Sequence, residues 1–226
     1  MYKAILWDID GTLLDFSKTL NAALKECFRI CGLGECSDSM VRRYSVINGG
    51  YWERLERGDI TKPELFVRRF EDFFGEYGIE YDTAEFDRLY KLELGNHVFF
   101  NDNSYELVKS LRGRVKQYAV SNTPAAELSA KLKKSGLDCL LDGIFISENL
   151  GADKPSSAFF DRVFAQIPES REEVIIVGDS LTSDIRGANN AEIACCWYYD
   201  PAGRQAPADL RIDYTISDLN EITSII

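Results

Sequence analysis

The chain has 226 residues, of which 45% are hydrophobic and 28% charged, a composition typical of a soluble globular protein with a sizeable core. Its formal charge of -11 repels polyanions, which excludes nucleic-acid polymers and anionic membranes as expected partners. No apolar run approaches the roughly 18 residues of a membrane span, and the first residues do not resemble a secretory signal, so we expect a cytoplasmic protein. The chain has a single histidine, His97, which excludes a three-histidine zinc site.

The first predicted element is a strand over residues 3–7, which ends in two acids and a glycine, Asp8-Ile9-Asp10-Gly11-Thr12. Ligands bind at the carboxyl ends of strands in open α/β sheets. A pair of carboxylates at such an end can hold a hard cation, and one of them can attack an electrophile. The segment therefore predicts a reactive site.

Residues 16–99 predict a block of helices, because apolar residues recur at spacings of three and four. Short apolar runs then alternate with helical patterns, which predicts strands over residues 117–121, 143–147, 174–178, 194–198 and 213–216. The helices between them are predicted over residues 125–134, 155–166 and 181–191. A loop is expected over residues 200–207, and a last helix begins at Ser217 or Asp218.

Alternating strands and helices indicate an α/β fold with a doubly wound parallel sheet. Because the first strand belongs to the same sheet as the later ones, the helical block is an insertion into one sheet domain. We expect a core domain of residues 1–15 and 100–226 and a helical domain of residues 16–99. The chain would cross between these domains twice, which predicts a hinge.

Polar residues follow several predicted strands, namely Asp8, Asp10, Ser121-Asn122-Thr123 and Gly178-Asp179-Ser180 with Asp184 after it. In a parallel sheet these strand ends lie on one edge, so side chains distant in sequence can converge on one pocket. Several carboxylates in one pocket repel one another unless a divalent cation neutralises them, and all-oxygen ligation suits magnesium. Mg²⁺ is therefore the expected cofactor.

Such a pocket predicts phosphoryl chemistry. A bound cation with Lys154 beside it would hold a phosphoryl group and stabilise the charge on its oxygens. Asp8 would attack phosphorus to give an aspartyl phosphate, and Asp10 would protonate the leaving oxygen and later deprotonate water. The remaining phosphoryl oxygens would meet donors from Thr12, Ser121 and Asn122.

Four elements of the sequence resemble the haloacid dehalogenase-like (HAD) superfamily across essentially the whole chain: Asp8-Ile9-Asp10-Gly11-Thr12-Leu13, Ser121-Asn122, Lys154-Pro155 and Gly178-Asp179-x-x-x-x-Asp184. The resemblance implies a Rossmannoid core, Asp8 as nucleophile, Asp10 as acid and base, and Ser121 and Lys154 as phosphate ligands. It also implies that magnesium is held by Asp8, the backbone carbonyl of Asp10 and Asp179, with Asp184 supporting the metal directly or through water.

Asp10 separates two activities within that superfamily. Its dehalogenases lack the second acid of the first motif, whereas this chain has Asp10. An alkoxide leaving group needs a proton and a halide does not, so Asp10 points to phosphoryl transfer.

The helical block resembles the mobile cap of the superfamily, which closes over the nucleophile and selects the substrate. Residues 48–53 and 56–61, with Arg68-Arg69-Phe70, resemble a subgroup of pyrimidine 5'-nucleotidases that includes enzymes clearing noncanonical nucleotides. A Pro-Gly pair common in the superfamily after the cap is absent, and Phe100-Asn101-Asp102-Asn103 stands there. Two interpretations stay open, helix core or substrate contact, for three residues spaced by four: Tyr44, Asn48 and Trp52.

The expected function is that of a magnesium-dependent phosphomonoester hydrolase acting through an aspartyl phosphate, with pyrimidine nucleoside monophosphates as the first candidate substrates. Alternatives with the same core are a sugar-phosphate or phosphoglycolate-type phosphatase and a phosphosugar mutase. A phospho-aspartate signalling module is the alternative from another class, against which the inserted helices and Asp10 argue. The expected partner is a small-molecule phosphomonoester, and the expected state is a monomer or homodimer.

Overall fold

The computed structural model describes residues 1–198 and 206–226, so most of the predicted loop over residues 200–207 lies outside the described residues. The chain divides into two compact units, which we call the sheet unit, residues 1–15 and 100–226, and the helical unit, residues 16–99. Within the described ranges, no helix combines the length and the apolar character that a membrane crossing requires.

The helical unit consists of α1 (Phe16–Ile30), α2 (Asp38–Glu56), α3 (Lys62–Tyr77) and α4 (Thr83–Asn96), as the spacing of its apolar residues predicts. Side chains fix where three of these helices begin. Ser37 accepts a hydrogen bond from the backbone of Met40 at the start of α2, and Asp82 does the same for Glu85 at the start of α4. Thr61 and Glu64 form a capping box at the start of α3.

Aromatic rings fill the core of the helical unit. Tyr44 stacks on Phe70 with ring centroids 5.0 Å apart, and Phe86 meets Phe70 edge to face at 4.9 Å. These side chains come from α2, α3 and α4, so the core joins helices that are distant in sequence. Offset and edge-to-face ring pairs of this kind add to the stabilisation that burial gives.

The sheet unit contains a single six-stranded parallel sheet in the described residues, in the order β3-β2-β1-β4-β5-β6. Its strands are β1 (Ala4–Trp7), β2 (Lys116–Ser121), β3 (Gly143–Ile146), β4 (Val174–Gly178), β5 (Ala194–Tyr198) and β6 (Tyr214–Ile216). The predicted strand bounds differ from these by at most one residue. β1 and β4 are apolar and buried along their whole length, as central strands of a parallel sheet are. The prediction of a doubly wound parallel sheet is confirmed.

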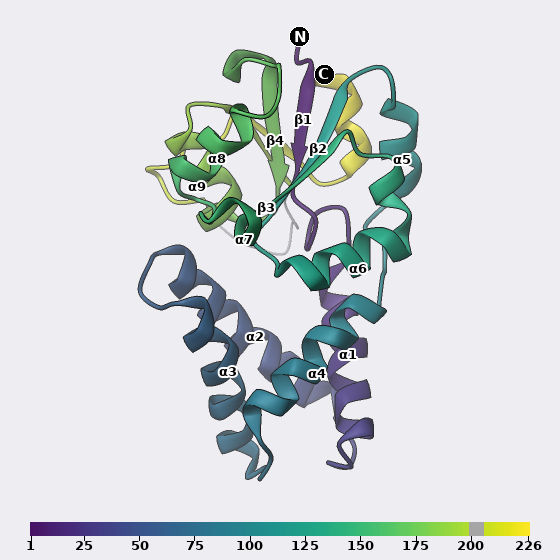
Figure 1. Ribbon diagram of the computed structural model, residues 1–226, viewed down its shortest axis with the longest axis vertical. Helices are drawn as coiled ribbons and strands as arrows, with labels where there is room; N and C mark the ends of the chain where they lie inside the picture. The colour runs from purple at the N-terminus through teal and green to yellow at the C-terminus, as the bar shows by residue number, and fades with distance from the viewer. Residues whose placement is uncertain (199–205) are drawn as a thin grey trace. The chain divides into compact units, whose positions relative to one another are not determined.

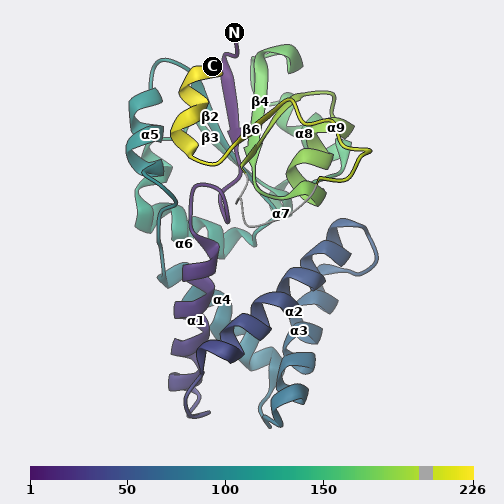
Figure 2. The same cartoon turned by 180° about the vertical axis from the view of Figure 1, so that it is seen from behind.

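Helices cover both faces of this sheet, and Figures 1 and 2 show α5 on one side and α8 and α9 on the other. On the first face, Leu6 belongs to the same buried core cluster as Phe159 and Phe160 of α8. On the second face the Trp7 indole donates to Gln117 at 3.2 Å, and the Gln117 amide donates to the carbonyl of Val108 in α5 at 2.9 Å. The side chains of successive residues of β1 thus point to opposite faces of the sheet, which different helices cover.

The helices of the sheet unit are α5 (Ser104–Leu111), α6 (Ala125–Ser135), α7 (Ser147–Leu150), α8 (Ser157–Phe164) and α9 (Arg186–Asn190). Short 3₁₀ helices cover Leu137–Cys139, Arg171–Glu173 and Leu219–Ser224. The last of these corrects the expected C-terminal helix, which is a 3₁₀ helix that Asp218 caps. The predicted helix over residues 181–191 is also divided, since a π-helical turn, Leu181–Ile185, precedes α9. α5 lies in a segment for which the sequence predicted no element.

Candidate active site

The candidate site lies at the carboxyl ends of the central strands. Trp7 at the end of β1 pairs with Ala119 of β2 and Val177 of β4, so β1 ends between these two strands. The backbone of Asp8 continues the pairing by donating to Val177 at 2.9 Å. Side chains that follow β1, β2 and β4 therefore gather at one edge of the sheet, where the strand order changes direction.

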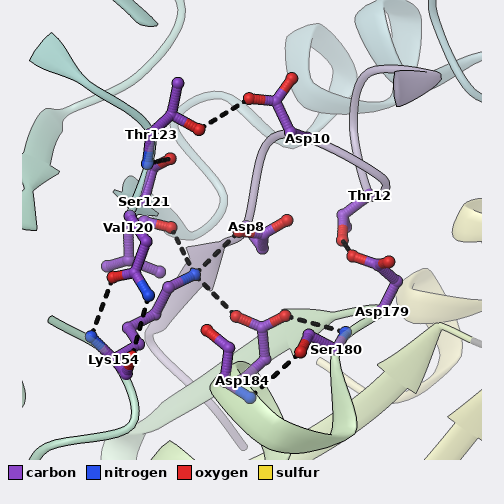
Figure 3. A network of polar contacts seen from close by, with 12 residues as sticks. Asp8, Asp10, Thr12, Val120, Ser121, Thr123, Lys154, Asp179, Ser180 and Asp184 are labelled. Atoms are coloured by element: carbon purple, nitrogen blue, oxygen red, sulfur yellow. Dashed lines mark hydrogen bonds and ion pairs between the residues drawn. The ribbon is translucent and has the colours of Figure 1, made fainter. Parts of the chain in front are cut away.

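Three carboxylates meet at this edge, and we call them the acidic cluster: Asp8, Asp179 and Asp184. One carboxylate oxygen from each lies within 4.8 Å of the other two. Asp8 and Asp184 are buried and Asp179 is half-buried. Figure 3 shows the three side chains arriving from the end of β1, the end of β4 and the π-helical turn.

Lys154 places its ammonium group against two members of the acidic cluster. Its ammonium group donates to Asp8 at 2.8 Å, to Asp184 at 2.7 Å and to the carbonyl of Val120 at 2.9 Å. Burial lowers the pKa of Lys154, but the charges of Asp184 and Asp8 outweigh burial, and the pKa lies above its ordinary value. The ammonium group is therefore charged and faces two carboxylates directly.

The acidic cluster carries more negative charge than Lys154 can neutralise. Burial raises the pKa of Asp8 to about 7, against the opposing effect of Lys154. Burial and the nearby charges of Asp8 and Asp184 raise the pKa of Asp179 well above its ordinary value. A divalent cation would relieve this repulsion, and carboxylate oxygens are the ligands that magnesium prefers. The donor set fits such an ion.

Gly11, in the first motif, allows the carboxylate of Asp179 to approach the backbone after β1 closely. Gly11 has a φ of +101°, and a Cβ on it would lie 2.6 Å from a carboxylate oxygen of Asp179. The hydroxyl of Thr12 donates to the other oxygen of Asp179 at 3.3 Å. The segment after β1 thus contributes Asp8 to the acidic cluster and also binds Asp179.

Asp10 has a different environment from Asp8, although only one residue separates them. Its carboxylate accepts hydrogen bonds from the hydroxyl of Thr123 and from the ammonium group of Lys131, both at 2.8 Å. In Figure 3 the carboxylate of Asp10 turns toward Thr123, whereas that of Asp8 lies beside Lys154. Lys131 also pairs with Glu127 at 2.6 Å. The sequence placed Thr123 among the polar residues of this edge, but it did not predict that Lys131 and Glu127 belong to the site.

Ser121 and Asn122 form the frame of the site in this structure. The side-chain amide of Asn122 donates to the carbonyl of Lys154 at 2.8 Å, and the backbone of Lys154 donates back to its oxygen at 2.9 Å. The hydroxyl of Ser121 accepts from the backbone of Thr123 at 3.1 Å. Asn122 thereby fixes the backbone that carries the buried lysine, and the contacts of both residues with a phosphoryl group stay predictions.

Asn101 ties the segment that returns to the sheet unit to the first motif. Its side-chain amide donates to the carbonyls of Gly11 and Thr12 at 3.0 and 2.9 Å, and Ser104 donates to the carbonyl of Leu13 at 2.7 Å. These bonds hold the backbone just after Asp10. The polar segment that stands in place of a Pro-Gly pair therefore braces the loop that follows β1.

The three candidate contacts of the helical unit differ in burial. Tyr44 is fully buried among aromatic rings, so in this structure it is a core residue of the helical unit. Asn48 is also buried, and its side-chain oxygen accepts from Arg69 at 2.8 Å. Trp52 is half-buried and meets the ring of Phe66 with centroids 6.4 Å apart.

Known proteins with a similar sequence and fold belong to the family that the sequence motifs indicate. The family model described as haloacid dehalogenase-like hydrolase matches residues 2–192. The chain therefore belongs to the haloacid dehalogenase-like hydrolases, and its resemblance to that superfamily is confirmed. It is an enzyme, and its class within the family is that of the phosphatases.

Particular relatives sharpen the comparison. The chain is 33% identical to the HAD-hydrolase YfnB of Bacillus subtilis, covering 100% of this chain and 95% of YfnB. It is 34% identical to the pyrimidine 5'-nucleotidase PynA of Streptococcus pneumoniae, covering 87% of this chain and 84% of PynA. A crystal structure of YfnB bound to magnesium, which reveals interdomain movement in that protein, matches with a TM-score of 0.94 at 32% identity and covers 99% of this chain and 98% of that one.

Proposed function

We propose that this chain is a magnesium-dependent phosphomonoesterase that acts through an aspartyl phosphate on pyrimidine nucleoside 5'-monophosphates. The observation that carries the proposal is the separate environment of the two acids after β1. Asp8 lies in the acidic cluster against Lys154, whereas Asp10 binds Thr123 and Lys131. Two carboxyl groups in different environments suit two tasks, attack and proton transfer.

In the first half of the reaction, an oxygen of Asp8 forms a bond to phosphorus and the ester oxygen leaves with the bonding electron pair. Asp10 gives that oxygen its proton. In the second half, a water molecule gives a proton to Asp10 while its oxygen attacks phosphorus. The bond between phosphorus and Asp8 breaks, and inorganic phosphate leaves with Asp8 restored.

The acidic cluster and the backbone carbonyl of Asp10 would hold the magnesium ion. When bound, the ion supplies positive charge that offsets the carboxylates and stabilises the phosphoryl oxygens. Lys154 adds positive charge beside the carboxylate of Asp8, to which its ammonium group donates at 2.8 Å. The remaining phosphoryl oxygens would meet donors from Thr12, Ser121 and Asn122.

The choice of pyrimidine nucleotides rests on relatives and on the helical unit. The pyrimidine 5'-nucleotidase PynA shares 34% identity over most of both chains, which supports a nucleotide substrate. We infer that the helical unit serves as the cap that selects the substrate. Among Tyr44, Asn48 and Trp52, the half-buried Trp52 is the candidate for stacking on a base.

A panel of phosphomonoesters, read by phosphate release in the presence of magnesium, tests the proposal. We expect the highest kcat/KM for pyrimidine nucleoside monophosphates, with lower values for purine nucleotides, sugar phosphates and phosphoglycolate. Equal turnover of all would remove the nucleotidase assignment, and a preference for sugar phosphates would move it to that alternative. A long-lived phospho-aspartate without turnover would indicate a signalling module.

A variant separates the chemistry from the choice of substrate. Asp8→Asn removes the attacking oxygen's charge while preserving the shape of the side chain. It should abolish hydrolysis of every member of the panel, a generic aryl phosphate included. Full hydrolysis of the aryl phosphate by this variant would refute the reaction scheme itself, whatever the substrate preference.

A further inference from the structure

Lys131 is a buried lysine that the proposed reaction does not use. Its side chain is 1% exposed, and its ammonium group lies 2.8 Å from Asp10 and 2.6 Å from Glu127. Burial lowers the pKa of Lys131, but the charges of Asp10 and Glu127 outweigh burial, and the pKa lies above its ordinary value. A buried charge is costly unless paired, so the two carboxylates account for its presence in the interior.

The carboxylate of Asp10 is held at both of its oxygens. Lys131 donates to Oδ1 and Thr123 donates to Oδ2, each at 2.8 Å. Thr123 lies just before α6 and Lys131 lies in that helix, so one continuous segment supplies both donors. One donor on each oxygen restricts rotation of the side chain, which a single hydrogen bond would not do.

The location of Lys131 in α6 also indicates a specific role. Leu128 and Leu132 flank it on the buried face of the helix, at the spacing that normally continues as an apolar stripe. Glu127 lies one turn earlier, is buried too, and accepts a hydrogen bond from Lys131. A lysine needed only for helix stability would gain more from the solvent-exposed face.

We propose that Lys131 is a positioning residue that fixes the carboxyl group of Asp10 where protons are transferred. This role rests on the proposed function, which makes Asp10 the acid and base of the reaction. Lys131 does not touch the phosphoryl group. Proton transfer depends on fixed geometry, so a carboxyl group that has lost one of its two donors transfers protons more slowly.

The dependence of the rate on the leaving group tests this role. The value of kcat/KM reports the steps up to formation of the aspartyl phosphate, and protonation of the leaving oxygen matters for an alkyl ester but not for p-nitrophenyl phosphate. We expect Lys131→Met to lower kcat/KM for a nucleoside monophosphate by about 10-fold to 100-fold and for p-nitrophenyl phosphate by less than about threefold. Asp10→Asn should show the same pattern with a larger loss.

Matched variants separate positioning from stability. Lys133→Met changes an exposed lysine of the same helix and should leave both substrates unaffected. Lys131→Arg keeps the charge and should recover part of the loss on the nucleotide. If Lys131→Met does not fold, the double variant Lys131→Met/Glu127→Leu removes both buried charges and should show the same dependence on the leaving group.

Two results would overturn the role of Lys131: equal losses on both substrates, or no loss in a folded Lys131→Met protein. Failure of the proposed function would look different. Wild-type protein that releases phosphate from neither substrate would refute that function, and so would Asp10→Asn without any dependence on the leaving group. Neither observation involves a variant of Lys131.

Discussion

The carboxylate of Asp184 lies against Gly178, where a Cβ on the glycine would come within 2.3 Å of it. Asp184 folds back over the end of β4 from the π-helical turn, and π-helical turns of this kind are frequent at functional sites. One of its oxygens accepts from the backbone of Ser180 at 3.1 Å, and the other accepts from Lys154 at 2.7 Å. The geometry of the acidic cluster therefore requires a residue without a side chain at the end of β4.

Gly178→Ala should displace Asp184 and weaken magnesium binding. Changes to residues that orient a metal ligand typically lower the affinity for the metal by about 10-fold or more. We therefore expect the magnesium concentration for half-maximal activity to rise by about tenfold or more. The measurement is a magnesium titration of phosphate release. Gly75→Ala in α3 is the control, since nothing lies within 4 Å of its added Cβ. An unchanged magnesium requirement in Gly178→Ala would contradict the account of Asp184.

Lys154→Met should destabilise the sheet unit strongly in the absence of magnesium. Lys154 is 1% exposed, and without it Asp8 and Asp184 lose the cation between them, which typically costs about 3–5 kcal/mol for a buried pair. Added magnesium should restore part of the free energy of unfolding, because the ion binds the folded state and supplies positive charge. Chemical denaturation with and without magnesium measures both effects.

Lys116→Met is the matched control for that variant. Lys116 also lies 2.7 Å from an aspartate, Asp142, but its side chain is 55% exposed. Exposed pairs contribute little, so we expect a much smaller loss in the free energy of unfolding than for Lys154→Met, and no effect of magnesium. If the two variants lost similar amounts of the free energy of unfolding, burial would not explain how much the ion pairs of Lys154 stabilise the protein.

A buried ion pair also organises the helical unit. Arg69 donates to Asp87 at 2.6 Å and to Asn48 at 2.8 Å, and Lys91 pairs with the other oxygen of Asp87 at 2.6 Å. The Arg69 side chain is 3% exposed and lies over the ring of Phe70 with its guanidinium carbon 5.0 Å from the ring centroid. It links α2, α3 and α4 within one core.

Arg69→Met should therefore lower the free energy of unfolding by about 3–5 kcal/mol, because Asp87 loses a buried partner. Arg68→Met provides the comparison one residue away, where an exposed arginine pairs with Glu64 at 2.9 Å, and its loss in the free energy of unfolding should be far smaller. Circular dichroism during urea unfolding gives both values. Equal values for Arg68→Met and Arg69→Met would show that Arg69 has no special structural role.

Removal of magnesium should abolish activity and leave the fold intact. The acidic cluster is anchored by the ends of β1 and β4, whose pairing rests on backbone hydrogen bonds, so chelation should not change the far-ultraviolet circular dichroism. The midpoint of thermal unfolding should rise when magnesium is added back, since the ion binds the folded state. Unfolding on chelation, or full activity without magnesium, would contradict this prediction.

Much of the sheet unit was predictable from sequence because its strands are apolar, short and separated by helical patterns. The runs at β1, β4 and β5 leave little ambiguity, and Asp8, Asp179 and Asp184 follow β1 and β4 closely enough to predict that they meet. Lys154 was placed with them by its position before a predicted helix and by the superfamily motif. The 3₁₀ helix after Asp218 was mistaken for an ordinary helix because a good capping residue precedes both kinds.

Other parts of the site depend on contacts that sequence patterns do not encode. Lys131 lies 121 residues from Asp10, and its only local sign is a lysine on an apolar helix face beside Leu128 and Leu132. Gly178 stands next to an aspartate in the sequence, but the close approach of Asp184 depends on the π-helical turn. These contacts become visible only when α6 and that turn are placed on the sheet.

The most direct test of the central claim is to trap phosphate on the enzyme and locate it. Asp10→Asn should still form the aspartyl phosphate from p-nitrophenyl phosphate, whose leaving group needs no proton, but it lacks the base for the second half of the reaction. Rapid quenching, borohydride reduction and peptide mass spectrometry should find the modified residue at Asp8. Steady release of phosphate with no modification at Asp8, or modification at another carboxylate, would contradict the account.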